Sequence, residues 1–226
     1  LTADIGGTNT RVALFDNEKL LENSCVTYSN NEYDSFEYII KNYLDLVNES
    51  SVRFAGIAAA GPIQEKSAKM TNLSWNLTER SIASITGAEQ VGIINDLQAQ
   101  GYGLTSLDKA DLEPVTVGSQ SANSNATRLV CGIGTGFNAA PVFNVGHKIF
   151  VPPSEAGHSQ LSLTDKNYQP VFAKIGSEGS FVSVEDILSG RGLENVGRAL
   201  TGNDQTAAQI MQKASQGDEN SKKVAH

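Results

Sequence analysis

Residues 1–11 read Leu1-Thr2-Ala3-Asp4-Ile5-Gly6-Gly7-Thr8-Asn9-Thr10-Arg11, and a further apolar run follows at residues 12–15. A short apolar run that reaches an acid, turns on a glycine pair and then resumes predicts a strand, a tight turn and a second strand. Glycines at positions 6 and 7 allow the backbone to take positive φ and to approach a ligand without a Cβ in the way. We therefore expect a hairpin with an exposed backbone turn at the glycine pair.

The same turn has the chemistry of a phosphate site. Backbone N–H groups exposed in such a turn form a concavity that binds anions. Thr8, Asn9 and Arg11 add side-chain donors, and Asp4 could hold a metal ion through water. Phosphate with a divalent cation needs that combination, but an ordinary β-hairpin with a glycine-rich turn fits the same residues. This stretch alone leaves both interpretations open.

Composition sets the class of protein. The 226 residues suffice for one large or two modest domains, and 39% hydrophobic with 19% charged residues is typical of a globular protein. A net charge of −8 argues against a nucleic-acid partner or an anionic membrane surface. No apolar run approaches the length of a membrane span. Cys25 and Cys131 stand beside apolar residues and are expected to be buried, reduced thiols, not a disulfide or a metal site.

A helix between strands predicts the architecture of the first half. Apolar residues recur with helical spacing over residues 35–49, and buried-strand patterns follow at residues 54–60 and 91–94. This order implies a crossover connection and an α/β sheet. Asn95 and Asp96 come where the last strand ends, which is where ligands bind in open α/β sheets. Alternatively, Asp96 is only the N-cap of a helix over residues 97–104.

The second half repeats the opening pattern. We place the domain boundary near residues 105–111, with a small domain over 1–106 and a large one over 107–226, and residues 115–117 suit a short strand. A strand at residues 127–133 leads into Gly134-Thr135-Gly136 and then into apolar residues again. Neither a dinucleotide-binding G-x-G-x-x-G nor a P-loop is present. Two turns of this kind suggest two domains of related design that bind one nucleotide, although both could be plain hairpins.

Further polar residues of interest lie in the second half. Glu155 and His158 flank a glycine, so both can point at one small polar ligand, although a surface loop explains them as well. Residues 184–188 read as the start of a helix capped by Ser183 with Asp186 as the reciprocal partner. Glu185 would stand in its first turn, where a carboxylate is favourable without any function.

These motifs together resemble the bacterial glucokinases that lack a structural zinc, within the hexokinase-like, actin-type ATPase superfamily. They cover nearly the whole chain in the order of that family. The matching pieces are Asp4-Ile-Gly-Gly-Thr-Asn-x-Arg11, Ala60-Gly-Pro62, Thr71-Asn72-x-x-Trp75, Ile94-Asn-Asp96, Gly132-x-Gly-Thr-Gly136, Glu155-x-Gly-His158 and Val182-Ser-x-Glu185-x-x-Leu-Ser-Gly190.

The resemblance implies a two-domain actin-like (ribonuclease H-like) α/β fold and transfer of phosphate from ATP to the 6-hydroxyl of glucose. It implies Asp96 as the catalytic carboxylate and Asp4 as a Mg²⁺ residue acting through water. It also implies a cytoplasmic homodimer that binds neither nucleic acid nor membrane. The sugar hydroxyls would be held by Asn95, Asp96, Glu155, His158 and Glu185. The ATP phosphates would be held by the residues of the two turns, Gly6, Gly7, Thr8, Asn9, Arg11, Gly134, Thr135 and Gly136.

Two departures from the family pattern affect this expectation. The second turn usually continues with another glycine where this chain has Asn138. The adenosine-binding segment of the family would lie beyond residue 226, so we expect a fragment whose 226 residues alone are inactive or poorly folded. Two alternatives stay open: a kinase for another hexose, and a sugar-binding regulator on the same fold that does not catalyse.

Overall fold

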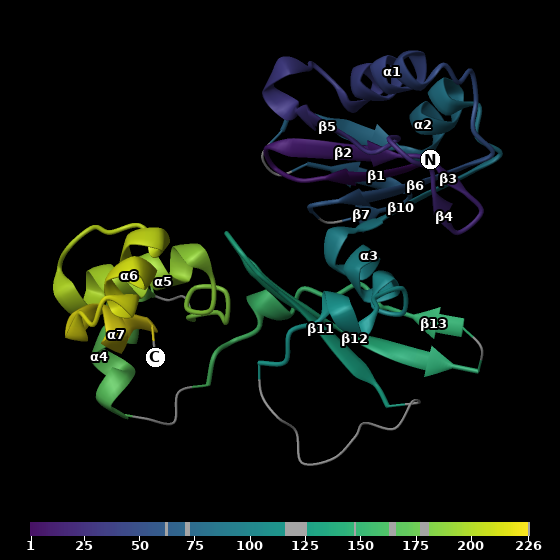
Figure 1. Cartoon of the computed structure of the whole chain (residues 1–226). Coiled ribbons are helices and arrows are strands. Elements are labelled where there is room, and N and C mark those ends of the chain that lie inside the picture. Colours follow the sequence, from purple (N-terminus) through teal and green to yellow (C-terminus); the bar gives the residue numbers. More distant parts are fainter. Residues whose placement is uncertain are drawn as a thin grey trace. The chain divides into compact units, whose positions relative to one another are not determined.

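The computed structural model describes residues 1–61, 63–70, 73–115, 126–146, 148–162, 166–176 and 181–225. It confirms the α/β class, and the chain forms two units, Leu1–Pro114 and Val115–His226 (Figure 1). The domain boundary at 106/107 stays a prediction. Pro62, Thr71 and Asn72 of the family motifs, and residues 116–117 of the suggested short strand, lie outside the described residues.

The first unit is built on a five-stranded sheet whose strand order is β10-β6-β1-β2-β5. The strands are β1 (Thr2–Ile5), β2 (Asn9–Ala13), β5 (Val26–Ser29), β6 (Phe54–Ala59) and β10 (Gln90–Asn95). β1, β6 and β10 run parallel, and β2 and β5 are antiparallel additions beside β1. The carboxyl ends of the three parallel strands therefore share one edge, which brings together the glycine turn and the Asn95-Asp96 pair.

Two helices, α1 (Phe36–Val47) and α2 (Glu79–Thr86), cover one face of this sheet (Figure 1). α1 buries an apolar stripe at helical spacing, as the sequence predicts, and Trp75 joins the same core. α2 begins after Thr78, whose hydroxyl accepts from the N–H of Ser81, and it ends at Gly87 with φ of 65°. The opposite face carries exposed residues of β1 and β2, among them Asp4 and Arg11.

The remaining elements of the first unit are short. They are β3 (Phe15–Asp16), β4 (Lys19–Leu20), η1 (Asn30–Glu32), β7 (Ile63–Gln64), β8 (Ser67–Lys69), β9 (Asn76–Thr78), α3 (Asp96–Gly103) and η2 (Lys109–Asp111). β8 pairs with both β7 and β9, which makes a small three-stranded sheet. Val26–Ser29 pairs with β2 and forms the edge of the five-stranded sheet.

The second unit has a three-stranded sheet in the order β11-β12-β13 and a group of helices. The strands are β11 (Arg128–Ile133), β12 (Phe137–Val145) and β13 (Lys148–Phe150). The helices are η3 (Ala156–His158), η4 (Lys166–Tyr168), α4 (Gln169–Ile175), α5 (Gly190–Thr201), α6 (Ala207–Ser215) and α7 (Glu219–Ala225). The hairpin of β11 and β12 confirms the second strand–turn–strand prediction.

A helix over residues 184–188 is a wrong prediction. Ser183 and Asp186 do form the reciprocal hydrogen bonds of a capping box: Ser183 N–H donates to Asp186 Oδ2 at 2.9 Å, and Asp186 N–H donates to Ser183 Oγ at 3.3 Å. The chain only turns there, and the helix starts at Gly190 after Ser189, whose Oγ accepts from Gly192 N–H at 2.9 Å. The cap pattern stabilises a turn as well as a helix, because both offer free N–H groups.

The buried cysteines are a second wrong prediction, since Cys25 and Cys131 are both exposed free thiols. Val130 is buried and Cys131 follows it on β11, so the alternation of the strand turns the thiol to the other face. No helix among the described residues combines the length and the apolar character needed to cross a membrane.

Candidate functional site

The first glycine turn joins β1 to β2 at the shared carboxyl edge. Ile5 pairs with Thr10, and Gly6 N–H donates to the carbonyl oxygen of Asn9 at 3.0 Å. Five described glycines have positive φ, and neither Gly6 nor Gly7 is one of them. The predicted use of positive φ is therefore wrong, because a four-residue turn closes without the left-handed backbone that two-residue hairpins need. Gly7, Thr8 and Asn9 remain exposed, as a phosphate-binding turn requires.

Asn30 holds this turn through hydrogen bonds to Gly6, Thr8 and Thr10. Sequence reasoning did not identify Asn30 as part of the site. Its side-chain Nδ2 donates to the carbonyl oxygen of Gly6 at 2.9 Å, and its Oδ1 accepts from the hydroxyl of Thr10 at 2.7 Å. Its backbone N–H donates to the carbonyl oxygen of Thr8 at 2.8 Å. Asn30 and Thr10 are 2% and 0% exposed, so these bonds are shielded from water. No local pattern marks Asn30, because its partners are 20 or more residues away in the sequence.

Asp4 and Arg11 are cross-strand partners on the open face of the sheet. Their side chains are 3.9 Å apart between Asp4 Oδ2 and Arg11 Nη1, and both are more than half exposed. They border a largely apolar cavity of about 580 Å³ that also includes Ala58 and Ile94. The described residues contain no group of three or more His, Cys, Asp or Glu arranged to hold a metal ion. A Mg²⁺ ion brought by a nucleotide needs only one or two carboxylates, so Asp4 fits that use.

The capping role that the sequence left open for Asp96 falls to its neighbour Asn95. Asn95, not Asp96, caps α3: its Oδ1 accepts from Leu97 N–H at 2.9 Å, and Gln98 completes the capping box. Asn95 Nδ2 donates to the carbonyl oxygen of Gly61 at 3.2 Å, which ties the ends of β6 and β10 together. Asp96 is the first residue of α3, and its Oδ1 accepts from the same Leu97 N–H at 2.9 Å.

The carboxyl group of Asp96 is partly withdrawn from water. Burial raises the pKa of Asp96 above its ordinary value, and the negative charge of Asp4 raises this pKa further. The hydrogen bond from Leu97 N–H acts in the opposite direction by stabilising the ionised form. A carboxylate with a raised pKa at the carboxyl edge of a sheet is suited to accept a proton from a bound hydroxyl group.

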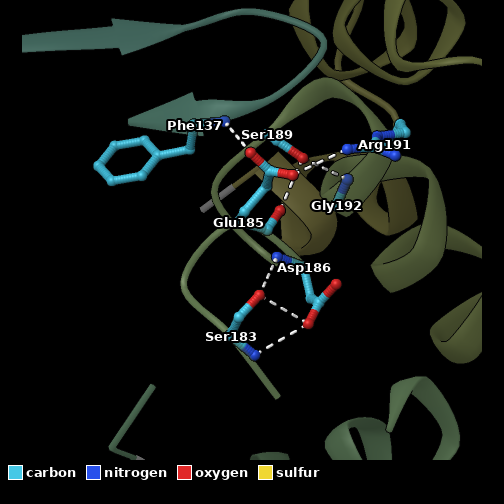
Figure 2. A network of polar contacts seen from close by, with 7 residues as sticks. All are labelled: Phe137, Ser183, Glu185, Asp186, Ser189, Arg191 and Gly192. Atoms are coloured by element: carbon cyan, nitrogen blue, oxygen red, sulfur yellow. Dashed lines mark hydrogen bonds and ion pairs between the residues drawn. The ribbon is translucent and has the colours of Figure 1, made fainter. Parts of the chain in front are cut away.

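The second glycine turn is closed by an internal hydrogen bond and contacts two other segments of the second unit. Gly134 N–H donates to the carbonyl oxygen of Gly136 at 2.9 Å, and Gly190 N–H donates to the carbonyl oxygen of Gly134 at 2.7 Å. Phe137 N–H donates to Glu185 Oε2 at 2.9 Å (Figure 2). A Cβ on Gly136 would lie 2.6 Å from that same oxygen, and a Cβ on Gly157 would lie 2.0 Å from the carbonyl oxygen of Phe137. Glycine is needed at Gly157 because the crowding atom there is backbone. At Gly136 the crowding atom is the end of the Glu185 side chain, which could move only by giving up its bond from Phe137 N–H.

Asn138, the departure from the family pattern, organises the loop that carries Glu155. Its Nδ2 donates to the carbonyl oxygen of Ser154 at 2.6 Å, and its Oδ1 accepts from Ala156 N–H at 2.9 Å. These bonds hold the backbone on both sides of Glu155. Asn138 therefore has a structural use inside the second unit.

The structure brings the expected site residues into two groups. In the first unit, the glycine turn lies at the same sheet edge as Asp4, Asn95 and Asp96. In the second unit, the glycine turn lies beside Gly157, His158 and Glu185. Glu185 N–H donates to the carbonyl oxygen of Gly157 at 2.9 Å, and His158 and Glu185 line one cavity of about 270 Å³. Glu155 is exposed beside this group but does not line that cavity. The roles of all these residues as ligands stay predictions.

Known proteins resemble this chain over nearly its full length. A family model described as Glucokinase matches residues 1–225. The glucokinase of Chromohalobacter salexigens is 34% identical over 204 residues, which cover 88% of this chain and 62% of that protein. The crystal structure of a glucokinase from an Antarctic psychrotroph has a TM-score of 0.82 at 29% identity and covers 99% of this chain and 73% of its own.

A more distant structure, that of the Balamuthia mandrillaris glucokinase in complex with glucose, shares the fold. It has a TM-score of 0.73 at 22% identity and covers 99% of this chain and 71% of its own. The chain spans less than two thirds of the length of the curated relative from Chromohalobacter salexigens, at 62%.

Proposed function

The chain belongs to the glucokinase family, and on that premise we propose that the protein carrying it transfers the γ-phosphoryl group of ATP to the 6-hydroxyl of glucose. The observation that carries the proposal is the carboxyl edge of the five-stranded sheet. There a half-buried Asp96 with a raised pKa shares an edge with an exposed glycine turn and the carboxylate of Asp4.

Asp96 is the proposed catalytic residue. Its carboxylate orients the sugar 6-hydroxyl and accepts the proton as the oxygen attacks the γ-phosphorus. The bond from the γ-phosphorus to the bridging oxygen breaks, and ADP leaves with that electron pair. Phosphoryl transfer depends mainly on positioning and charge neutralisation, so one well-placed base is enough on the protein side. The raised pKa of Asp96 favours uptake of the proton.

The phosphate groups are assigned to the two turns and their neighbours. The proposed donors in the first unit are the exposed N–H groups of Gly7, Thr8 and Asn9 and the guanidinium group of Arg11. Gly134, Thr135 and Gly136 contribute the second turn. Asp4 would hold Mg²⁺ through water, and the ion would neutralise charge on the phosphates.

The sugar hydroxyls are assigned to Asn95, Glu155, His158 and Glu185. A hydroxyl group both donates and accepts, so carboxylates paired with an amide or an imidazole satisfy it fully. Asn95 already uses its Oδ1 for the cap of α3 and its Nδ2 for Gly61, which leaves it fewer sites than the other three. A cytoplasmic location and a homodimer belong to the same proposal and follow from the family alone.

A panel of sugars tests the proposed function. Full-length protein, Mg²⁺ and ATP are combined with glucose, mannose, fructose or N-acetylglucosamine, and ADP release is followed by a coupled assay. We expect glucose to give the highest kcat/KM. A higher kcat/KM for another hexose would identify that hexose as the substrate. Glucose binding in calorimetry without turnover would show that the protein is a sugar-binding regulator and not a kinase.

Asn30 provides a prediction about the first turn. In Asn30→Ala, the carbonyl oxygen of Gly6 and the hydroxyl of Thr10 lose their buried partner, which destabilises the fold by about 1–3 kcal/mol. We expect the KM for ATP to rise about tenfold, equivalent to ~1.4 kcal/mol, because the turn is no longer held. The KM for glucose should change little. Steady-state kinetics in ATP and glucose, with thermal unfolding, measure both effects.

The matched control is Asn31→Ala, because Asn31 is the exposed neighbour and only accepts from the hydroxyl of Ser29. It should leave both KM values and the unfolding temperature unchanged. An Asn30→Ala protein with lowered stability but an unchanged KM for ATP would show that Asn30 serves the fold and not the turn.

A further inference from the structure

The carboxylate of Glu185 is held at both of its oxygens. Oε2 accepts from Phe137 N–H at 2.9 Å, at the end of the second glycine turn, and Oε1 accepts from Arg191 Nη2 at 2.8 Å. Figure 2 shows Glu185 between these two partners. Each carboxylate oxygen has two lone pairs, so capacity remains at both for hydroxyl donors of a ligand.

The start of α5 sets the position of Arg191. Ser189 Oγ donates to the carbonyl oxygen of Glu185 at 2.7 Å and accepts from Gly192 N–H at 2.9 Å, so the backbone of Glu185 and the first turn of α5 are joined. Gly190 N–H also binds the carbonyl oxygen of Gly134. Arg191 therefore reaches Glu185 from a helix start that is fixed on two sides.

Arg191 borders the same small cavity as the expected sugar residues. The cavity of about 270 Å³ is lined by polar side chains, including His158, Glu185, Arg191 and Asn195. The side chain of Arg191 is 65% exposed and that of Glu185 is 21% exposed. An ion pair as exposed as this contributes little to the free energy of folding. Replacing Arg191 should therefore change ligand binding without unfolding the protein.

We propose that Arg191 is a positioning residue for sugar recognition, which it serves by holding Glu185 Oε1 at the cavity. The proposal rests on the proposed function. Without the guanidinium group, Glu185 keeps only the bond from Phe137 N–H and can pivot around it. The sugar then has to order the carboxylate on binding, and affinity falls by the lost rotamer freedom. Because Arg191 acts through Glu185, its effect must vanish when the carboxylate is removed.

The test is a double-mutant cycle in the full-length protein. Arg191→Ala should raise the KM for glucose about tenfold and leave kcat and the KM for ATP within about twofold. Arg191→Lys should recover part of the loss, since an ammonium group pairs with one carboxylate oxygen but lacks the planar fork. In a Glu185→Ala background, which removes both acceptor oxygens, Arg191→Ala should add nothing further. Arg198→Ala is the control, because Arg198 lies on the same helix and pairs with Asp204.

The outcomes separate the proposals. An unchanged or lowered KM for glucose in Arg191→Ala, or full additivity with Glu185→Ala, overturns the role of Arg191 while glucose phosphorylation by the wild type stands. If the wild type binds glucose without turnover, the kinase proposal fails, and calorimetric Kd values in the same cycle still decide the role of Arg191. If the wild type neither binds nor phosphorylates any hexose of the panel, both proposals are wrong.

Discussion

In full-length protein, Asp96→Asn is expected to lower kcat for glucose phosphorylation by about 10²–10⁴, the range for loss of a positioned base. The substitution keeps the shape of the side chain, and an Asn Oδ1 can still accept from Leu97 N–H at the start of α3. The KM values for both substrates should change much less than kcat, because the lost interaction is the proton transfer. A coupled assay at saturating ATP and glucose measures the effect.

The pH profile gives this prediction a second readout. Burial raises the pKa of Asp96, so the carboxyl group stays protonated to a higher pH than an ordinary Asp. In the wild type, kcat/KM should therefore fall as the pH drops through this raised pKa, and Asp96→Asn should lose that acid limb. The same shift means that ionised Asp96 destabilises the fold above its pKa and that stability is regained below it. Asp96→Asn should accordingly be no less stable than the wild type at neutral pH.

The control for Asp96 is Asp45→Asn, because Asp45 is an exposed aspartate on α1. It should have wild-type kinetics and stability. Equal kcat in Asp96→Asn and the wild type, with folding verified by circular dichroism, would show that Asp96 is not the catalytic base.

Gly157→Ala is the second large effect that we expect. The added methyl group would lie 2.0 Å from the carbonyl oxygen of Phe137 and 3.1 Å from its carbonyl carbon, which are backbone atoms at the start of β12. Either η3 or the second glycine turn must shift, and forced repacking of this kind destabilises by about 1–3 kcal/mol. The bond from Phe137 N–H to Glu185 lies at the same residue, so kcat/KM for both substrates should fall by at least about tenfold.

Thermal unfolding and steady-state kinetics of Gly157→Ala, compared with Gly103→Ala, measure this effect. Gly103 ends α3 with no atom within 4 Å of an added Cβ, so alanine should be tolerated there and should stabilise the helix slightly. Unchanged stability and kinetics in Gly157→Ala would show that this contact is relieved by a small backbone movement and that the second turn does not depend on it.

Local sequence patterns were sufficient where neighbouring residues decide the structure. The two hairpins could be predicted because an apolar run, a glycine turn and a second run specify their own pairing. The helix α1 could be predicted from its apolar spacing. The shared edge could be predicted because strands connected through a helix run parallel, which places their carboxyl ends at the same edge of the sheet.

Local patterns failed where a distant contact chooses between alternatives. Ser183 and Asp186 form the hydrogen bonds of a cap, but residues 184–188 only turn. Val184 and Glu185 N–H donate to the carbonyl oxygens of Ser159 and Gly157, so a distant segment holds this turn. The apolar neighbours of Cys131 suggested burial, yet alternation along β11 exposes it. Both errors come from reading neighbours in sequence as neighbours in space.

The amino-acid order alone determines the α/β class, both glycine turns and the placement of Asp96 at the end of a strand, because each depends on contacts within one strand–turn–strand or strand–helix unit. Tertiary structure decides how the turns are held: Asn30 reaches Gly6 across 24 residues, and Glu185 reaches Phe137 across 48. It also decides that Asn95 takes the cap and that Asp96 keeps a raised pKa. Burial and long-range hydrogen bonds depend on which distant segments pack together, and no local pattern encodes that choice.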